Sequence, residues 1–206
     1  MAVRKVIEIG HKMLKLENKS VADLHSPLIK QLIRDLADTM KATDLIGIAA
    51  PQIGRNYQVF LTQPRKTMAR NVGKTDILRV YINPRITFQS EETNLIYEGC
   101  GCVPDHGIFA PVIRPKEIEI EAYDENGEQF SLRCDGILAR VIQHEYDHLQ
   151  GIEFLERVTE NRKIISWTFY RKDIRNSKEQ KAASLITKIE YKKITSPQPG
   201  KTVLVA

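Results

Sequence analysis

The sequence predicts one domain in which helices combine with antiparallel strands, followed by a basic extension. Apolar residues recur at helical spacing across 26–42, whereas they alternate with polar residues in 115–134. A chain of 206 residues is long enough for one sizeable core and too short to favour two ordinary domains. We expect a catalytic or binding domain at 1–160 and a mostly helical extension at 161–206.

The composition excludes several classes of protein. With 42% apolar and 28% charged residues, the chain resembles soluble globular proteins, and no stretch approaches the roughly 18 apolar residues of a membrane span. The N-terminal segment lacks the apolar region of a secretory signal peptide, so we expect a cytoplasmic protein without membrane contact. The net charge of +5 is spread along the chain without a nucleic-acid-binding motif, so DNA binding is not expected.

The first elements are a helix and two strands. Ser26 can cap a helix over 26–42 and Pro27 suits its first position, with an apolar stripe at Leu28, Leu32, Ile33, Leu36 and Met40. The side chains of the glycine-rich segment 44–54 are too small for it to pack as a regular element. We expect its backbone to lie close to a neighbouring group. The runs 57–61 and 77–84 read as strands, with a basic loop between them.

A hairpin and a second helix follow. In 115–134, Asn126-Gly127 supplies the turn, and Asp135 then caps a helix that Gly151 ends. The region 159–193 has helical character, with apolar stripes at Ile164, Ile165, Thr168, Phe169, Ala182, Leu185, Ile186 and Ile189. SPQPG at 196–200 breaks this pattern, and 201–206 forms a last strand or a disordered end.

The second helix carries a metal-binding motif, HEYDH at 144–148. Its two histidines lie one turn apart, so both imidazoles leave the same face and can reach one divalent ion. They continue the apolar row of Ile137 and Val141 and therefore point inward. Glu145 lies on the neighbouring row, where partial desolvation would raise its pKa toward neutrality. We predict a metal site here.

A catalytic site of this kind usually has a third protein ligand and an open position. The metzincin spacing requires a histidine at 154, where this chain has Phe154. Glu179 could serve, but it lies in the lysine-rich region without a supporting signature. Cys100, between two glycines, is the better candidate because a thiolate flanked by small residues can approach an ion closely.

Three segments together resemble the peptide deformylases. They are GIAAPQIG, EGC and QHEYDH, which occur in that family's order and roughly its spacing. The resemblance implies an α+β fold in which antiparallel sheets pack around a central helix that bears the HExxH motif. It also implies hydrolysis of the N-formyl group from the formyl-methionine of newly made proteins.

The resemblance further implies roles for individual residues. Metal-bound water would attack the formyl carbon with Glu145 as general acid and base, while the Gln52 amide and the Gly101 N–H stabilise the oxyanion. The metal ligands would be Cys100, His144 and His148, and the substrate-binding residues Gly47, Ile48, Gly54, Glu98 and Gly99. One divalent ion is implied, Fe²⁺ in the family, with Zn²⁺, Ni²⁺ or Co²⁺ also compatible with these ligands.

Taken alone, several of these residues have simpler interpretations. Gln52 could be a turn amide after Pro51, and Gly47 and Gly54 plain turn glycines. Glu98 either orients Cys100 or an arginine, or is a solvated charge.

The chain departs from the family pattern at four positions. Leu45 stands where the family usually has glycine, Gly101 and Cys102 replace Leu-Ser, and Gly107 lies near the place of a substrate-contacting arginine. Arg114 either compensates for that arginine or is a second family arginine. We expect Cys102 to be a small buried group, unbonded to Cys100 in the metal-loaded protein yet close enough to trap an oxidised Cys100.

Two alternatives to deformylation follow from these departures. One is an amidase of the same fold that removes another small N-acyl group. The other is a weakly active module that contacts the ribosome through its basic extension.

Overall fold

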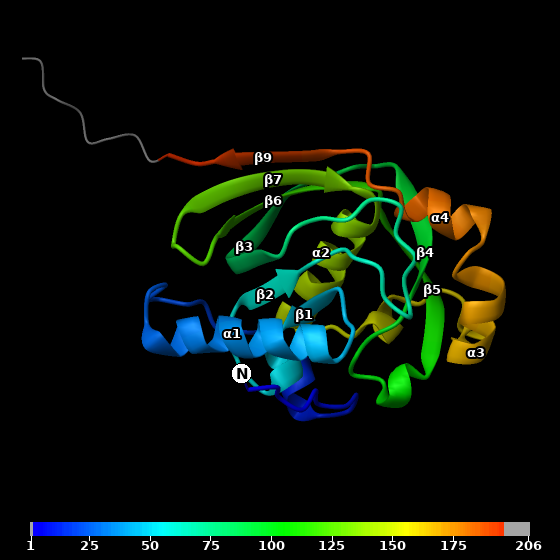
Figure 1. The fold of residues 1–206 in the computed structure, drawn as a ribbon, viewed down its shortest axis with the longest axis horizontal. Helices are drawn as coiled ribbons and strands as arrows, with labels where there is room; N and C mark the ends of the chain where they lie inside the picture. The colour runs from blue at the N-terminus through cyan, green and yellow to red at the C-terminus, as the bar shows by residue number, and fades with distance from the viewer. Residues whose placement is uncertain (1, 196–206) are drawn as a thin grey trace, which may run out of the picture.

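The computed structural model describes residues 2–195 and has the expected α+β architecture with antiparallel sheets (Figure 1). The two predictions made for 196–200 and 201–206 lie outside the described residues. Within 2–195, none of the helices has both the length and the apolar character that crossing a bilayer requires.

Two antiparallel sheets form the framework. The larger has six strands in the order β1-β2-β3-β6-β7-β9, namely Gly47–Ala49, Val59–Thr62, Arg79–Gln89, Glu117–Tyr123, Gln129–Asp135 and Ile189–Lys193. The smaller has the order β4-β5-β8, namely Thr93–Glu98, Ile108–Pro115 and Ile165–Ser166. The predicted hairpin is β6–β7, where Ile118, Ile120 and Ala122 pair with Cys134, Leu132 and Phe130. Strands β4 and β5 were not predicted.

Helix α1, Pro27–Ala42, follows the sequence prediction closely. The Ser26 hydroxyl accepts a hydrogen bond from the Ile29 N–H, and Pro27 occupies the first turn. The apolar face packs under β1 and β2 as part of one core cluster. Leu28 is an exception, because it lies 53% exposed at the start of the helix.

Helix α2, Gly136–Leu149, is buried along nearly its whole length and packs against β1, β2, β7 and α4, the last spanning Lys178–Ser184 (Figure 1). Gly151 follows its C-terminus with φ +74°, as expected of a stop residue. Asp135 occupies the N-cap position, but its side chain does not cap the helix. Its carboxylate instead accepts hydrogen bonds from the backbone N–H groups of Thr187 and Lys188, 2.8 and 2.9 Å long.

The extension is only partly helical, which corrects the prediction for 159–193. It contains β8, α3 (Trp167–Phe169), a π-helical turn at Tyr170–Ile174, α4 and β9. Ile189, expected on a helical stripe, lies in β9 opposite Cys134. The open edge of β7 offers unpaired backbone groups, and pairing with them outweighs the local helical pattern. Short 3-10 turns complete the chain at Lys12–Lys15, Ala50–Ile53, Pro104–His106, Phe154–Arg157 and Asn161–Lys163.

The Asp135 contacts should make the extension part of the folding unit. We expect Asp135→Ala to lower the free energy of unfolding by about 2–3 kcal/mol, because two backbone donors lose their acceptor. Urea denaturation checks this, with the exposed Glu125→Ala as the control. An unchanged midpoint for Asp135→Ala would contradict this account of how the extension is held.

Candidate metal centre and pocket

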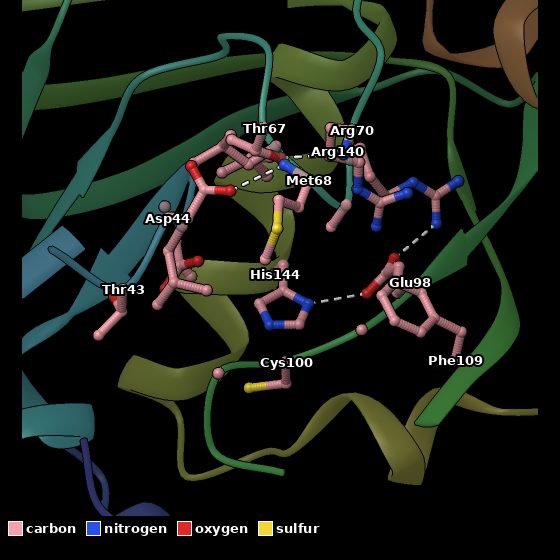
Figure 2. A pocket seen from close by; sticks show the side chains of 18 of the residues that line it. Thr43, Asp44, Thr67, Met68, Arg70, Glu98, Cys100, Phe109, Arg140 and His144 are labelled. Atoms are coloured by element: carbon pink, nitrogen blue, oxygen red, sulfur yellow. Dashed lines mark hydrogen bonds and ion pairs between the residues drawn. The ribbon is translucent and has the colours of Figure 1, made fainter. Parts of the chain in front are cut away.

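A pocket of about 390 Å³ opens beside α2 and contains most of the residues singled out in the sequence (Figure 2). Its lining comes from β1, the loop 67–70, the end of β4 and the inner face of α2. The predicted site residues among its walls are Gly47, Gln52, Glu98, Gly99, Cys100, Gly101, His144 and Glu145. Segments that are far apart in the sequence thus meet in one cavity.

Three buried side chains form a group that could hold one metal ion. The ligand atoms of Cys100, His144 and His148 all lie within 4.8 Å of one another. The Cys100 Sγ is 3.3 Å from the His148 Nε2. The histidines project from successive turns of α2, and Cys100 is the second residue after β4. Glu179 is exposed on α4 and does not join this group.

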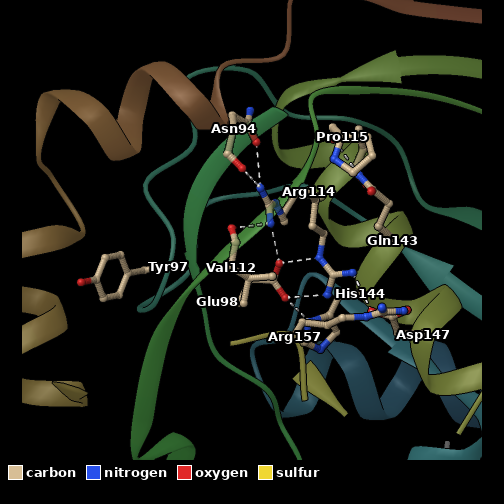
Figure 3. A network of polar contacts seen from close by, with 12 residues as sticks. Asn94, Tyr97, Glu98, Val112, Arg114, Pro115, Gln143, His144, Asp147 and Arg157 are labelled. Carbon is tan, nitrogen blue, oxygen red and sulfur yellow. Dashed lines mark hydrogen bonds and ion pairs between the residues drawn. The ribbon is translucent and has the colours of Figure 1, made fainter. Parts of the chain in front are cut away.

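Glu98 orients the first of these histidines (Figure 3). Its buried carboxylate accepts hydrogen bonds from Arg114 and Arg140, and its Oε2 lies 2.8 Å from the His144 Nδ1. Burial disfavours the charged form, but the two arginines and the histidine hold the pKa of Glu98 well below its ordinary value. Because a carboxylate can only accept, the proton of His144 is on Nδ1, and its Nε2 lone pair is available to an ion.

The second histidine is kept neutral by its surroundings. Burial, followed by the neighbouring His144 and Arg114, lowers the pKa of His148 well below its ordinary value. Metal ligation requires the neutral imidazole, so this environment suits a ligand.

Glu145 lies beside this group, with a buried carboxylate that faces the cavity. Its side chain is buried, and among the described residues its Oε2 has no partner. Burial, with further contributions from Cys102 and Glu98, raises the pKa of Glu145 well above its ordinary value. Gly47 makes this placement possible, since an added Cβ there would lie 2.5 Å from both the Glu145 Oε1 and the Val141 Cγ1.

Gln52 serves both as a turn residue and as a donor that faces the cluster. Its Oε1 accepts a 2.7 Å hydrogen bond from the Ala49 N–H, which fixes the orientation of the amide. The Nε2 then points at the thiols of Cys100 and Cys102, 3.7 and 3.6 Å away. The two interpretations of Gln52 are therefore compatible.

Two departures from the family pattern contact each other. A Cβ added at Gly101 would lie 2.8 Å from the Leu45 Cδ1, so the Leu45 side chain covers the open face of Gly101. Cys102 is a buried free thiol, as predicted, and Cys100 is also free.

Arg114 does not replace the missing pocket arginine. It is buried between Glu98 and Asp147, 2.7 and 2.6 Å from their carboxylate oxygens, and does not line the pocket. Glu98 is consequently a support residue for His144 and not a solvated charge.

Two predicted substrate-binding residues do not reach the pocket. The Ile48 side chain is fully buried in the core against α1, because β1 turns it away from the cavity. Gly54 ends the turn at Ala50–Ile53 with φ +73° and is exposed. Gly47 and Gly99, by contrast, line the cavity.

Several pocket residues were missed from the sequence. They are Thr43, Asp44, Met68, Arg70, Phe109, Arg140 and Trp167. Arg140 left a usable signal, an arginine on the buried side of a helix, where a charge requires a partner. Phe109 lies near the start of β5, and the others lie on loops or short elements, where nothing in the local pattern points to a cavity.

The contact between Leu45 and Gly101 predicts strong energetic coupling. Gly101→Leu alone should lower the free energy of unfolding by about 1–3 kcal/mol through overpacking, and adding Leu45→Gly should recover most of this loss. Urea denaturation of the two single variants and the double variant measures the coupling. Additive effects would contradict the contact.

Comparisons with known proteins agree with this geometry. The model of the polypeptide deformylase family matches residues 3–163. A peptide deformylase of Pseudothermotoga lettingae is 38% identical over 162 residues, covering 79% of this chain and 86% of that protein.

Solved structures of that family also resemble this chain. The peptide deformylase of Acinetobacter baumannii with Met-Ala-Ser bound has a TM-score of 0.70 and 32% identity, covering 76% of this chain and 99% of the other. A Synechococcus elongatus peptide deformylase in complex with actinonin has a TM-score of 0.67 and 34% identity, covering 77% and 80%. With its HExxH helix, its buried thiol and its two sheets, the chain belongs to the polypeptide deformylase family.

Proposed function

We propose that this protein removes the N-formyl group from N-formylmethionyl peptides of newly made proteins in the cytoplasm, using one divalent metal ion. The observation that carries the proposal is the buried group of Cys100, His144 and His148 with Glu145 beside it, whose Oε2 has no hydrogen-bonding partner within residues 2–195. The Acinetobacter baumannii relative with Met-Ala-Ser bound supports a methionine-led peptide as the product.

The donor set fits a divalent ion. Bonds of about 2.0–2.3 Å to a tetrahedral ion would separate the ligand atoms by roughly 3.3–3.8 Å, close to the spacing between Cys100 and His148. Contact with Cys102 and burial raise the pKa of Cys100 well above its ordinary value, so the thiolate needs a nearby cation, which deprotonates a coordinating thiol. We expect Fe²⁺, while the same ligands accept Zn²⁺, Ni²⁺ or Co²⁺. When bound, such an ion supplies Lewis acidity that polarises a carbonyl and acidifies water.

The protein's own groups then transfer the proton and stabilise the negative charge that develops on the formyl oxygen. Glu145, whose pKa is raised by burial, takes a proton at its carboxylate and returns it to the departing methionine amine. The Gln52 Nε2, fixed by the bond to Ala49, and the Gly101 N–H donate to the formyl oxygen as it becomes negative. One such donor typically lowers the activation barrier by about 3–4 kcal/mol.

The apolar part of the cavity suits the side chain of the first residue. Ile137 and Val141 line it on α2, next to His144, and Gly47 lines it on β1. An unbranched thioether fits an irregular apolar pocket well because its rotatable bonds let the side chain follow the shape of the pocket.

Activity assays test this function. The protein, purified without oxygen and loaded with Fe²⁺, Ni²⁺ or Co²⁺, should hydrolyse a formyl-Met peptide but not the acetyl-Met peptide. Glu145→Gln should lower kcat about 10²- to 10⁴-fold without loss of bound metal, whereas Cys100→Ala should lose the metal. The exposed Glu125→Gln is the matched control. Preference for the acetyl peptide would favour the related amidase, and inactivity with all three metals would exclude both.

We also propose a division of the chain into a catalytic domain at 1–160 and an extension that contacts the ribosome. The family match over 3–163 supports the boundary. Exposed cations at Arg171, Lys172, Lys178, Lys181 and Lys192 support contact with a phosphate-rich partner. Removing the extension would not test this cleanly, because Tyr170 and Gln180 are buried in the fold.

Charge reversal is the better test of ribosome contact. Replacing Lys172, Lys178 and Lys181 with glutamate should abolish salt-sensitive co-sedimentation with ribosomes and leave hydrolysis of a short formyl peptide unchanged. Reversing three exposed lysines elsewhere, Lys5, Lys30 and Lys41, is the control. Equal binding by both triple variants and the parent protein would refute the contact.

A further inference from the structure

The sole tryptophan of the chain, Trp167, lines the pocket although it lies beyond the residues that match the family. It is half-buried and belongs to the extension, at the start of α3. The extension therefore supplies a wall of the cavity in addition to its basic surface.

Backbone and ring contacts hold Trp167 in place. Its backbone N–H donates a 3.0 Å hydrogen bond to the Gly107 carbonyl, and the preceding strand β8 pairs with β5. Its ring lies 5.6 Å from that of Phe109, which is stacked on Tyr170 with centroids 3.8 Å apart. Phe109 in turn covers Gly99, where an added Cβ would lie 2.7 Å from the ring. A continuous row of rings thus runs from the extension to the segment that carries Cys100.

The extension also positions the loop 67–70, which supplies further pocket residues. Tyr170 donates to the Ala69 carbonyl at 3.0 Å and accepts a 2.7 Å hydrogen bond from Arg70. Next to these contacts, Met68 is 68% exposed and lines the cavity (Figure 2). Its N–H donates to Asp44 at 2.8 Å, which fixes the loop at this point.

The buried and exposed ends of the cavity define the path of a bound peptide. Glu145 and His144 are almost fully buried, whereas Met68 is exposed. A peptide whose formyl group reaches Glu145 must therefore leave past the exposed rim with the residues that follow its methionine. A half-buried aromatic side chain and an exposed thioether at a rim favour apolar partners, because contact removes apolar surface from water.

We propose that Trp167 is a specificity-determining residue that contacts the second residue of the peptide and, together with Met68, favours a large apolar side chain there. This inference rests on the proposed function, since it concerns the same pocket. It assigns to the extension a part in choosing among formyl-Met peptides.

Tryptophan fluorescence tests the contact without relying on catalysis. Because Trp167 is the only tryptophan, the emission reports this position alone. In metal-loaded Glu145→Gln, formyl-Met-Leu-Ser should shift the emission to shorter wavelength and reduce acrylamide quenching, whereas formyl-Met-Gly-Ser should change it little. Calorimetry gives the concentration at which each peptide saturates the protein. Identical fluorescence responses to the two peptides at saturation would overturn the proposal.

Kinetics test the preference. Trp167→Ala should raise KM for formyl-Met-Leu-Ser about tenfold and leave kcat for that peptide within twofold. For formyl-Met-Gly-Ser, both KM and kcat should change less than twofold. Trp167→Leu, which keeps apolar surface, should retain most of the preference. Phe169→Ala is the control, since this exposed aromatic residue on the same short helix does not line the pocket.

Outcomes for the two proposals remain distinguishable. If the parent protein turns over neither peptide, the proposed function itself is refuted. If the parent protein is active and the Trp167→Ala variant keeps the same preference for leucine over glycine, only the role of Trp167 is overturned. Equal losses on both peptides would assign Trp167 to the stability of the fold and likewise overturn that role.

Discussion

The buried carboxylate of Glu98 is the constraint on which the site depends. It lies at the end of β4 and joins this strand to Arg114 of β5 and to Arg140 and His144 of α2 (Figure 3). Glu98 pairs with both buried arginines, and Asp147 pairs with Arg114 and with the partly exposed Arg157. Losing one partner of such a buried group typically costs about 3–5 kcal/mol, because the remaining charge is stranded. The same contacts that tie the smaller sheet to α2 therefore also set the tautomer of His144.

Close approach of backbone is the second requirement of the pocket. Gly47 lets α2 bring Glu145 against β1, and Gly99 lets the Phe109 ring cover the turn before Cys100. At Gly101 the space is filled from the opposite side, by Leu45. The Leu45 side chain thus limits the space around Gly101, a residue whose backbone has wide conformational freedom of its own.

The extension forms part of the same fold. Its strand β9 covers the edge of β7, Asp135 holds the turn at Thr187, and Tyr170 is buried against Phe109. The sequence predicted a basic, mostly helical segment, because apolar residues recur there among many lysines and arginines. Sheet pairing and ring stacking decided otherwise, and both depend on surfaces that the rest of the chain provides.

By itself, the sequence determined the elements and residues whose signals are local. Spacing along the chain predicts the helix at 26–42, the helix between Asp135 and Gly151, the hairpin around Asn126-Gly127 and the paired histidines. The flanking glycines favoured Cys100 as the third ligand, and the resemblance added Gln52. Only the tertiary structure decided that Glu98 bonds to His144, that Leu45 covers Gly101, that Ile48 and Gly54 lie outside the cavity, and that Trp167 lines it. Each of these depends on contacts between residues that are distant in sequence. Such contacts form where buried charges find partners, where backbones can approach closely and where strand edges are open. Periodicity along the chain does not indicate any of these conditions.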